Sequence, residues 1–441
     1  MSTLLCERLK DKTAKIGVIG LGYVGLPLCL AIVRNGLEVL GFDIDPAKPQ
    51  SLKGGESYLK HIDSKQIREA NETGLFSYTS DFDQLSEPDI IIICVPTPLT
   101  RYREPDLSYL VDTCKEISKR LRHGQMVILE STTYPGTTSE VVRPALEESG
   151  LKCDVDFLIA YSPEREDPGN KTFSTSSTPK IIGADTLEAR ATAAAFYSIF
   201  IDKVVTVSDA KTAEMTKLAE NIFRSVNIAL VNELKIIADA MQIDIWEVID
   251  AARTKPFGYM PFYPGPGLGG HCIPIDPFYL TWKAKEFDLR TRFIELAGEI
   301  NTQMPYRVVE RLAEQLDIRF GKGLSGARIL LVGMAYKKNV DDMRESPALK
   351  ILHILERRGA LVSFFDPMVS EIPMTREHPE LAGRRSVTWH PKLGSKYDAV
   401  LIVTDHDDVD YVELVKSSAL VVDTRNACRR AGVESEKLIQ A

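Results

Sequence analysis

A glycine-rich segment in the middle of the chain places a cysteine close to a carboxylate. Residues 264–272 contain four glycines, and Asp276 follows four residues after Cys272. Glycines let the backbone approach a ligand closely, and a dense row of exposed amides suits a phosphate or a sugar ring. A thiolate at Cys272 would attack a carbonyl carbon, and the carboxylate of Asp276 would manage a proton or a water. We therefore expect covalent chemistry in this segment.

The other cysteines and the neighbouring histidine have plainer interpretations. The seven cysteines are scattered and form no CxxC pair, which argues against a disulfide framework and a zinc site. His271 either perturbs the thiol or satisfies local hydrogen bonds, and we favour the second. A metal site made from His271, Cys272 and Asp276 would lack further ligands at standard spacing, so no metal is expected.

Near the N-terminus, an apolar strand at 16–19 runs straight into a glycine turn. The turn reads Gly20-Leu21-Gly22-Tyr23-Val24-Gly25, and Asp43 stands at the tip of the next strand. In this context the first glycine permits the tight turn, the second lets a pyrophosphate approach, and the third lets helix and strand pack closely. Amides of the following helix then face the phosphates. Asp43 would bind ribose hydroxyls and repel a 2′-phosphate, so we expect NAD rather than NADP. The alternative is a purely structural glycine turn.

Further strands are expected at 89–95, 126–129, 157–160 and 180–183, with turn-rich segments after the first three. Segments that leave the C-terminal ends of parallel strands line the ligand crevice of such a sheet. The polar side chains predicted to meet there are Thr97, Ser131, Thr132 and Glu164.

From about 207 to 252 the pattern predicts a continuous helix and contains no proline. Lys217 and Asn221 are four residues apart, so both project from one face. A buried ammonium beside an amide would steady an alkoxide formed as a hydroxyl loses hydride; the alternative is a solvated lysine. The apolar stripe needs a cover, which either a dimer partner or the chain's own domains would supply. Its members are Ala213, Leu218, Ile222, Val226, Leu230, Leu234 and Ile237.

A second α/β unit begins at 327–333, and a helix is expected from Ser346 to Arg358. Strands at 360–365, 399–403 and 419–423 complete a smaller sheet. The predicted fold is therefore α/β, with two Rossmann-like doubly wound domains joined by a helical middle domain with a long central helix. The expected boundaries are 1–206, 207–317 and 318–441.

Bulk composition agrees with a soluble globular protein. The chain has 441 residues, 44% of them hydrophobic and 26% charged. A net charge of −8 argues against a nucleic-acid or membrane-surface binder. Neither a signal peptide nor an apolar run long enough to span a membrane is visible, so a cytoplasmic location is expected.

The chain resembles the nucleotide-sugar 6-dehydrogenases, the UDP-glucose/GDP-mannose dehydrogenase family. Segments 130–137, 161–170 and 264–280 resemble in particular the branch that acts on UDP-N-acetyl-D-glucosamine. Two positions differ from the UDP-glucose branch: His271 replaces a serine, and Pro168 replaces a second glutamate. The resemblance implies oxidation of the sugar C6 alcohol to a carboxylate, with two NAD⁺ and one water, in a homodimer or higher homo-oligomer. Surface polysaccharide biosynthesis would consume the product.

The resemblance also implies residue roles. Cys272 would form a thiohemiacetal and then a thioester. Lys217 and Asn221 would stabilise oxyanions, Asp276 with Thr132 would hold the water, and Glu164 would assist thioester hydrolysis. Arg344 would join Gly20, Gly22, Tyr23, Val24, Gly25, Asp43, Thr97, Ser131 and Thr132 as a cofactor contact. Arg253 would come from the neighbouring subunit, and the UDP-sugar contacts would be Glu164, Arg165, Lys217, Asn221, Arg253, Tyr263, Gly265, Gly267, Gly269, Lys337 and Arg425.

Several alternatives stay open. The alternative substrates to UDP-N-acetyl-D-glucosamine (UDP-GlcNAc) are UDP-ManNAc, UDP-GalNAc and UDP-glucose. A β-hydroxyacid dehydrogenase shares the first two domains, but it needs neither Cys272 nor a third domain. A catalytically idle nucleotide-sugar sensor would have no use for the set of cysteine, lysine and carboxylates.

Overall fold

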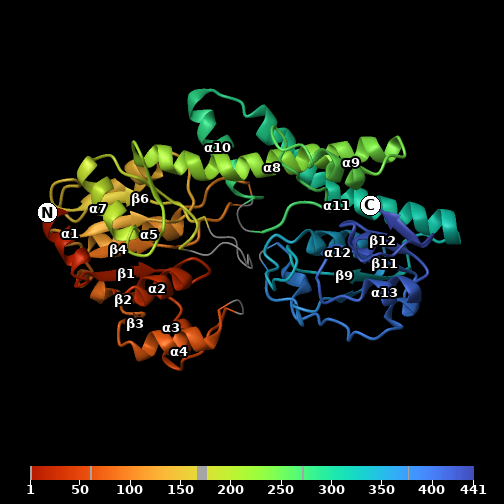
Figure 1. Cartoon of the computed structure of the whole chain (residues 1–441), viewed down its shortest axis with the longest axis horizontal. Coiled ribbons are helices and arrows are strands. Elements are labelled where there is room, and N and C mark those ends of the chain that lie inside the picture. Colours follow the sequence, from red (N-terminus) through yellow and green to blue (C-terminus); the bar gives the residue numbers. More distant parts are fainter. Residues whose placement is uncertain (1, 60–61, 101, 166–175, 271–272, 376) are drawn as a thin grey trace. The chain divides into compact units, whose positions relative to one another are not determined.

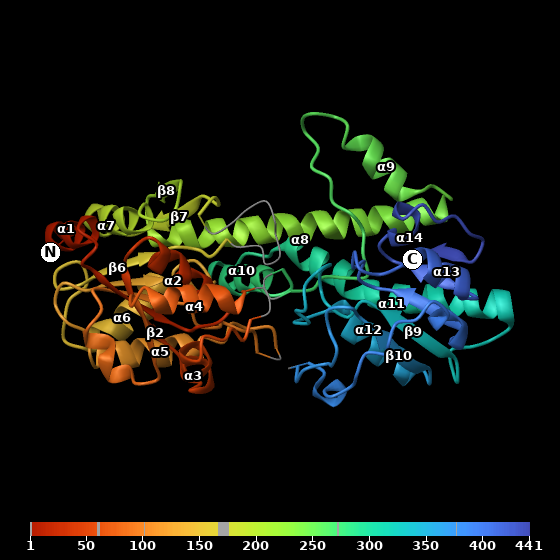
Figure 2. The same cartoon turned by 60° about the horizontal axis from the view of Figure 1, so that its bottom comes forward.

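The computed structural model describes the chain except residues 1, 60–61, 101, 166–175, 271–272 and 376. It falls into two compact units whose elements are labelled in Figures 1 and 2. The N-terminal unit comprises Met1–Glu220 and Phe278–Leu289, and the C-terminal unit comprises Asn221–Pro277 and Arg290–Ala441. Helix α8 (Ala210–Ala240) contributes residues to both.

The N-terminal unit is built on a sheet with strand order β3-β2-β1-β4-β5-β6-β7-β8. Neighbouring strands run parallel, except that β6 and β7 are antiparallel. The strands predicted at 126–129 and 180–183 coincide with β5 and β7, and those predicted at 89–95 and 157–160 overlap β4 and β6. The bounds are β1 (Lys15–Ile19), β2 (Glu38–Phe42), β3 (Phe76–Thr79), β4 (Ile90–Ile93), β5 (Met126–Leu129), β6 (Leu158–Tyr161), β7 (Lys180–Gly183) and β8 (Val204–Val207).

Helices cover both faces of this sheet, which is why its central strands are apolar throughout. In β4, Ile90 and Ile92 join one core while Ile91 and Ile93 join the other, and all four are buried. The covering elements are α1 (Ser2–Lys10), α2 (Gly25–Arg34), α3 (Ala47–Lys53), α4 (Ser64–Glu72), η1 (Phe82–Ser86), α5 (Ser108–Ser118), η2 (Thr138–Val142), α6 (Arg143–Glu147) and α7 (Leu187–Tyr197). Helix α10 (Asp276–Ala284) and the turn η3 (Lys285–Phe287) follow later in the chain.

The C-terminal unit holds a smaller parallel sheet with strand order β10-β9-β11-β12-β13. Its strands are β9 (Arg328–Val332), β10 (Leu361–Phe365), β11 (Ala399–Ile402), β12 (Val421–Asp423) and β13 (Leu438–Gln440), the last of which was not predicted. The predicted helix from Ser346 to Arg358 is α12 (Pro347–Arg357), and Ser346 caps its N-terminus. The other helices are α9 (Ile245–Ala252), α11 (Arg292–Phe320), α13 (Tyr411–Ser417) and α14 (Ala427–Arg430), with short turns η4 (Pro379–Leu381) and η5 (Leu393–Lys396).

The expectation of one continuous helix from 207 to 252 was wrong. Helix α8 ends at Ala240, and α9 begins at Ile245. Gln242 adopts a left-handed φ of 58°, which stops the helix, and the Asp244 side chain caps α9 by accepting from the Trp246 nitrogen at 2.9 Å. The sequence contains no glycine or proline at this break, so periodicity alone did not reveal it.

Both sheets are predominantly parallel and covered by helices, and a helical region lies between them in the sequence, which confirms the predicted α/β fold class. Within the part of the chain that the structure describes, no helix is both long and apolar enough to cross a lipid bilayer.

The glycine turn between β1 and α2 depends on two of its three glycines for packing. A Cβ at Gly20 would lie 2.5 Å from the Cys94 carbonyl oxygen, and Gly20 also has a φ of +97°. A Cβ at Gly25 would lie 1.9 Å from the Gly20 carbonyl oxygen. Gly22 differs, because nothing lies within 4 Å of its Cβ position. Positions 20 and 25 therefore have no room for a side chain, whereas the space at Gly22 is open.

We predict that Gly25→Ala destabilises the protein by about 3 kcal/mol, because overpacking against backbone cannot relax cheaply. Gly22→Ala should change the free energy of unfolding by only about 0.5 kcal/mol or less, because its methyl group meets no neighbour. Urea unfolding of the two variants, followed without added cofactor, measures the difference. Equal destabilisation by both substitutions would contradict this account of the turn.

Candidate active site

The turn after β1 and the tip of β2 form a site that suits a dinucleotide. The buried Asp43 carboxylate accepts from the Leu21 nitrogen at 2.9 Å and the Asp45 nitrogen at 3.0 Å. It also forms an ion pair with Lys48 at 2.8 Å. A carboxylate has about four acceptor positions, so one stays for a ribose hydroxyl. Lys48 was not predicted, and its spacing of five residues from Asp43 is the sequence signal that was missed. These groups fit the predicted adenosine ribose, and the open space at Gly22 fits the pyrophosphate.

Three of the polar residues predicted to converge at the strand ends do lie together. The Thr97 hydroxyl donates to the Thr132 carbonyl at 2.6 Å, and the Ser131 hydroxyl donates to the Val95 carbonyl at 2.6 Å. The Tyr279 hydroxyl in turn donates to the Thr97 carbonyl. These hydroxyl groups hold backbone carbonyls, so they fix the path of the two segments past β4 and β5.

Lys217 and Glu164 form a buried pair in the N-terminal unit. The ammonium of Lys217, whose residue is 5% exposed, donates to the Glu164 carbonyl oxygen at 2.5 Å and to its carboxylate at 3.3 Å. A solvated lysine would be exposed, so that alternative does not fit. One turn further along α8, Glu220 pairs with Arg165 at 2.6 Å. Helix α8 therefore holds both residues of the Glu164-Arg165 segment, a connection that the sequence did not reveal.

Asn221 and Asp276 form a second buried pair, in the C-terminal unit. Their exposed fractions are 6% and 2%, and the Asn221 amide donates to the Asp276 carboxylate at 2.5 Å. Asp276 is the first residue of α10, where the positive end of the helix dipole favours the ionised carboxylate. His271 and Cys272, which carry the predicted covalent chemistry, lie outside the described residues.

A buried network of asparagines anchors the glycine-rich segment. The Gly265 nitrogen donates to the Asn232 side chain at 3.0 Å, and Asn232 donates to Asn301 at 3.0 Å. Asn301 donates to the Ser225 carbonyl at 3.1 Å. Asn232 lies on α8 and Asn301 on α11, so the anchor joins two helices far apart in sequence. Neither residue was predicted as part of the site.

The same segment lies against Arg425, a predicted substrate residue, and against Tyr336, both of which follow strands of the C-terminal sheet. A Cβ at Gly265 would lie 2.5 Å from the Arg425 guanidinium, and one at Gly269 would lie 2.7 Å from the Cβ of Tyr336, the neighbour of Lys337. Desolvation lowers the pKa of Arg425, so an anionic ligand there would favour its charged form. Gly267, which has a φ of +133°, lies against Asn301 and Pro305 instead.

Arg344 lies at the same segment, but its side chain is already paired. Its main-chain carbonyl accepts from the Gly270 nitrogen at 3.0 Å. Its guanidinium donates to both carboxylate oxygens of the buried Asp342, at 3.0 Å to Oδ1 and 2.6 Å to Oδ2. The predicted contact between Arg344 and the cofactor stays a prediction.

Arg253 and Tyr263 lie together near α9. Arg253 donates to the Tyr263 hydroxyl at 3.2 Å, and that hydroxyl donates to Asp250 at 2.8 Å. The Tyr263 ring stacks on Trp246 at 5.3 Å. Arg253 is exposed, which leaves its guanidinium accessible to a partner molecule.

Four of the described cysteines have pKa values that burial raises, which makes them poor nucleophiles. Burial raises the pKa of Cys114 to about 12 and raises the pKa values of Cys29, Cys94 and Cys428 as well. Thiols of this kind stay protonated and unreactive near neutral pH. Cys94 is thus a small residue packed beside the core.

Comparisons with known proteins agree with these geometries. The NAD-binding domain of the UDP-glucose/GDP-mannose dehydrogenase family matches residues 14–201, its central domain matches 211–303, and its UDP-binding domain matches 330–430. A UDP-N-acetyl-D-glucosamine 6-dehydrogenase from Pseudomonas aeruginosa is 37% identical over 90% of this chain and 92% of its own length. An NDP-N-acetyl-D-galactosaminuronic acid dehydrogenase from Ralstonia solanacearum is 33% identical over 93% of this chain and 95% of its own.

Among solved structures, that of the UDP-D-ManNAc dehydrogenase from Pyrococcus horikoshii is similar, with a TM-score of 0.86 and 32% identity. The similarity covers 97% of this chain and 98% of that one. The glycine turn with Asp43 supplies the features that NAD requires, and the matched UDP-binding domain contains Lys337 and Arg425. The chain belongs to the UDP-glucose/GDP-mannose dehydrogenase family and is an NAD-dependent UDP-sugar dehydrogenase.

Proposed function

We propose that the protein oxidises UDP-N-acetyl-D-glucosamine at C6 to the corresponding uronate. One water and two NAD⁺ are consumed, and two NADH and three protons are released per sugar. The choice of sugar is supported by the Pseudomonas aeruginosa relative, which is 37% identical and acts on UDP-N-acetyl-D-glucosamine according to its name. Relatives named for UDP-ManNAc and for an N-acetylgalactosaminuronic acid are 35% and 33% identical, so these sugars are the alternatives.

The observation that carries the proposal is the pairing of one helix with two catalytic segments. Lys217 and Asn221 lie four residues apart on α8, and each is buried against a carboxylate from a different segment, Glu164 and Asp276. A buried ammonium and amide on one helix face supply the donors that a developing alkoxide needs. A dehydrogenase with a single oxidation step has no need for the second carboxylate or the cysteine that precedes it.

The residues would act in sequence. NAD⁺, held by the glycine turn and Asp43, would supply the hydride acceptor for both oxidations of C6. Lys217 and Asn221 stabilise the sugar oxygen while it is negatively charged, and the Cys272 thiolate adds to the aldehyde to form a thiohemiacetal. The second oxidation leaves a thioester at Cys272. A water held by Asp276 and Thr132 then attacks the thioester carbon with help from Glu164, which releases the carboxylate and regenerates the thiol.

We propose three domains with separate roles. Residues 1–206 bind NAD, residues 207–317 carry the catalytic segment, and residues 318–441 bind the UDP-sugar. The matches to the NAD-binding, central and UDP-binding domains of the family lie inside these ranges. The contact of Arg425 with the glycine-rich segment supports a nucleotide-sugar site on the C-terminal sheet.

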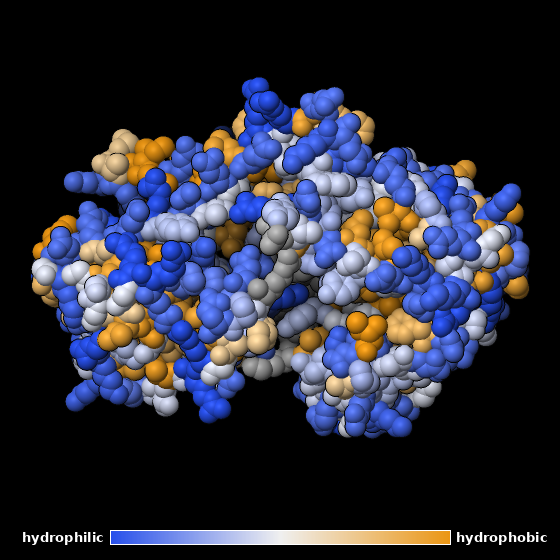
Figure 3. Space-filling view, turned by 180° about the vertical axis from the view of Figure 1, so that it is seen from behind, coloured by the Kyte–Doolittle hydropathy of each residue, from blue (hydrophilic) through white to orange (hydrophobic). Residues whose placement is uncertain are grey.

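We also propose that a second copy of the chain covers the apolar face of α8. Leu230, Leu234 and Ile237 belong to the stripe that needed a cover, and they stay 49%, 42% and 49% exposed. Met241, after the end of the helix, is exposed too. Apolar patches also interrupt the hydrophilic surface seen in Figure 3. A self-complementary helix face is the simplest cover for such a stripe, because a twofold axis lets one surface serve both copies.

The substrate and the covalent route are tested by one NADH-release assay with UDP-GlcNAc, UDP-ManNAc, UDP-GalNAc and UDP-glucose. We expect UDP-GlcNAc to have the highest kcat/KM and to release two NADH per sugar. Cys272→Ala should form no uronate yet keep its NAD affinity, because the thiol acts only on the aldehyde. Cys153→Ala, at a partly exposed cysteine of the N-terminal unit, is the control. Full turnover by Cys272→Ala would disprove the thioester, and one NADH per sugar in the wild type would disprove the second oxidation.

Lys217→Ala should lower kcat by roughly 100-fold or more, because it removes a buried donor to the oxyanion. Lys211→Ala, on the same helix but exposed, is the matched control and should keep kcat close to that of the wild type. Steady-state kinetics at saturating NAD⁺ measure both. If the two variants have the same kcat, Lys217 does not stabilise the oxyanion.

Leu234→Glu should convert the protein to monomers, because it places a charge inside the proposed interface between two α8 helices. Leu361→Glu changes another exposed leucine, at the start of β10, and should leave the assembly unchanged. Sedimentation velocity of the two variants and the wild type separates the outcomes. A monomeric wild type would rule out the dimer.

A further inference from the structure

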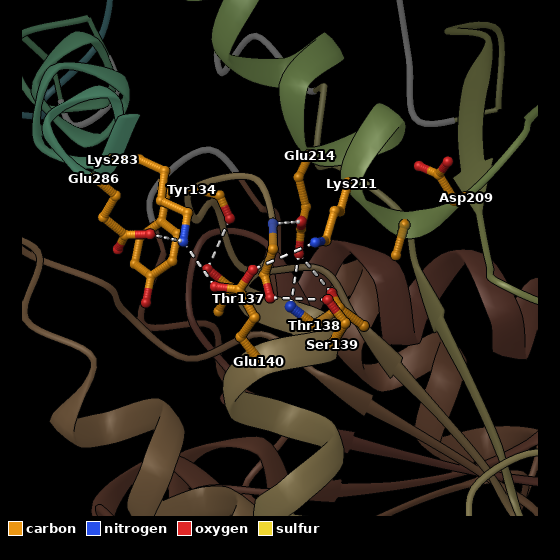
Figure 4. Close-up of polar contacts among 12 residues, drawn as sticks. Tyr134, Thr137, Thr138, Ser139, Glu140, Asp209, Lys211, Glu214, Lys283 and Glu286 are labelled. Atoms are coloured by element: carbon orange, nitrogen blue, oxygen red, sulfur yellow. Dashed lines mark hydrogen bonds and ion pairs between the residues drawn. The ribbon is translucent and has the colours of Figure 1, made fainter. Parts of the chain in front are cut away.

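A fully buried carboxylate on α8 has no part in the roles described above. Glu214 lies one helical turn before Lys217. One carboxylate oxygen accepts from the Gly136 nitrogen at 2.6 Å. The other accepts from the nitrogen and the hydroxyl of Thr138, at 2.8 and 2.6 Å. Figure 4 shows Glu214 among these partners. Two of the three donors are amides that can only donate, so the ionised carboxylate binds all three best.

The segment that Glu214 holds is the one that carries Thr132. At its start, Thr97 and Ser131 fix the backbone through their hydroxyl groups. At its end, Glu214 binds Gly136 and Thr138, just where the π-helical turn η2 begins. Gly136 has a φ of +107°, which makes this bend available to glycine but costly for other residues. The position of Thr132 is thus set from both sides.

The same segment is also tied to α10, the helix that begins with Asp276. Glu140 forms an ion pair with Lys283 of α10 at 2.7 Å, and the Tyr134 ring lies 5.0 Å from that of Trp282. The ion pair is partly exposed and is therefore weaker than the buried contacts of Glu214. Of the two connections, the one through Glu214 is the more rigid.

We propose that Glu214 is a positioning residue for the oxidation: its ionised carboxylate holds the Thr132 segment at the turn of α8 that presents Lys217, and uptake of a proton loosens the segment. The proposal rests on the roles proposed for Lys217 and Thr132. On this proposal, the placement of Thr132, which holds the water, relative to Lys217, which donates to the oxyanion, depends on the buried charge of Glu214.

The electrostatic surroundings place this proton uptake near neutral pH. Burial raises the pKa of Glu214 to about 7, and it outweighs the hydrogen bonds from Thr138 and Gly136, which lower it. The negative charge of Glu140 raises it further. Glu140 is itself balanced by Lys211 at 3.3 Å and by Lys283, which also binds Glu286.

The sign of the pH effect follows from the raised pKa. The stability that protonated Glu214 contributes is complete below its ordinary pKa of 4.5 and is lost as the pH rises through about 7. Over this same interval the ionised form, which holds the Thr132 segment, becomes populated. Activity should therefore increase while this contribution to stability decreases.

The test is the pH profile of kcat between about pH 6 and pH 9, measured with whichever UDP-sugar is the best substrate. Glu214→Gln leaves at least one amide without an acceptor, so we expect kcat at about pH 8 to fall roughly tenfold, with the sugar KM changed by about twofold or less. The rise of kcat near neutral pH should disappear in this variant. Thr138→Val should move the rise to higher pH, because it removes a hydrogen bond that lowers the pKa of Glu214.

Asp209→Asn is the matched control, since Asp209 lies at the start of the same helix and caps Thr212 without touching the Thr132 segment. It should keep the wild-type profile. A wild-type kcat in Glu214→Gln, or a lower kcat with the same rise near neutral pH, would overturn the proposal. Lys217→Ala distinguishes a failure of the Glu214 proposal from a failure of the proposed function. If that variant is fully active, the proposed role of Lys217 fails, whatever the pH profile of Glu214→Gln shows.

Discussion

A row of buried polar side chains along one face of α8 is the constraint on which the site depends. Glu214, Lys217, Asn221, Ser225, Asn232 and Lys235 are all buried and are separated by steps of three, four and seven residues. Such steps keep side chains on one side of a helix. A buried polar group without a partner costs free energy, and four of these side chains take their partners from other segments of the chain. Helix α8 therefore anchors catalytic segments within each of the two units.

The partners come from very different parts of the chain. Glu214 holds the segment after β5, Lys217 holds the segment after β6, Asn221 holds the start of α10, and Asn232 holds the glycine-rich segment. Because the helix is rigid, the spacing of Glu214 and Lys217 is passed on to two segments of the N-terminal unit, and that of Asn221 and Asn232 to two segments of the C-terminal unit. Catalysis by groups from separate segments requires such fixed relative positions, since small displacements reduce the rate strongly.

Burying polar groups along α8 has a second consequence, on the helix's other side. The apolar stripe is buried at Ala213 and Leu218 but exposed at Leu230, Leu234 and Ile237. In an ordinary amphipathic helix the apolar face would be the buried one. In the second half of α8, Asn232 and Lys235 are buried while these three apolar residues are exposed, and a second copy of the chain would cover them. The same helix would then connect catalysis with assembly.

The sequence by itself determined the local features: the glycine turn with Asp43, most of the strands, helix α12, the family, and the four-residue spacing of Lys217 and Asn221. Each depends on neighbours in sequence, where periodicity and turn chemistry act directly. Only the tertiary structure decided which groups meet across long separations, such as Lys48 with Asp43, Glu220 with Arg165, and Asn232 with Asn301 and Gly265. It also decided that the polar face of α8 is buried, because burial depends on which segments pack against a helix, and no pattern within the helix specifies them.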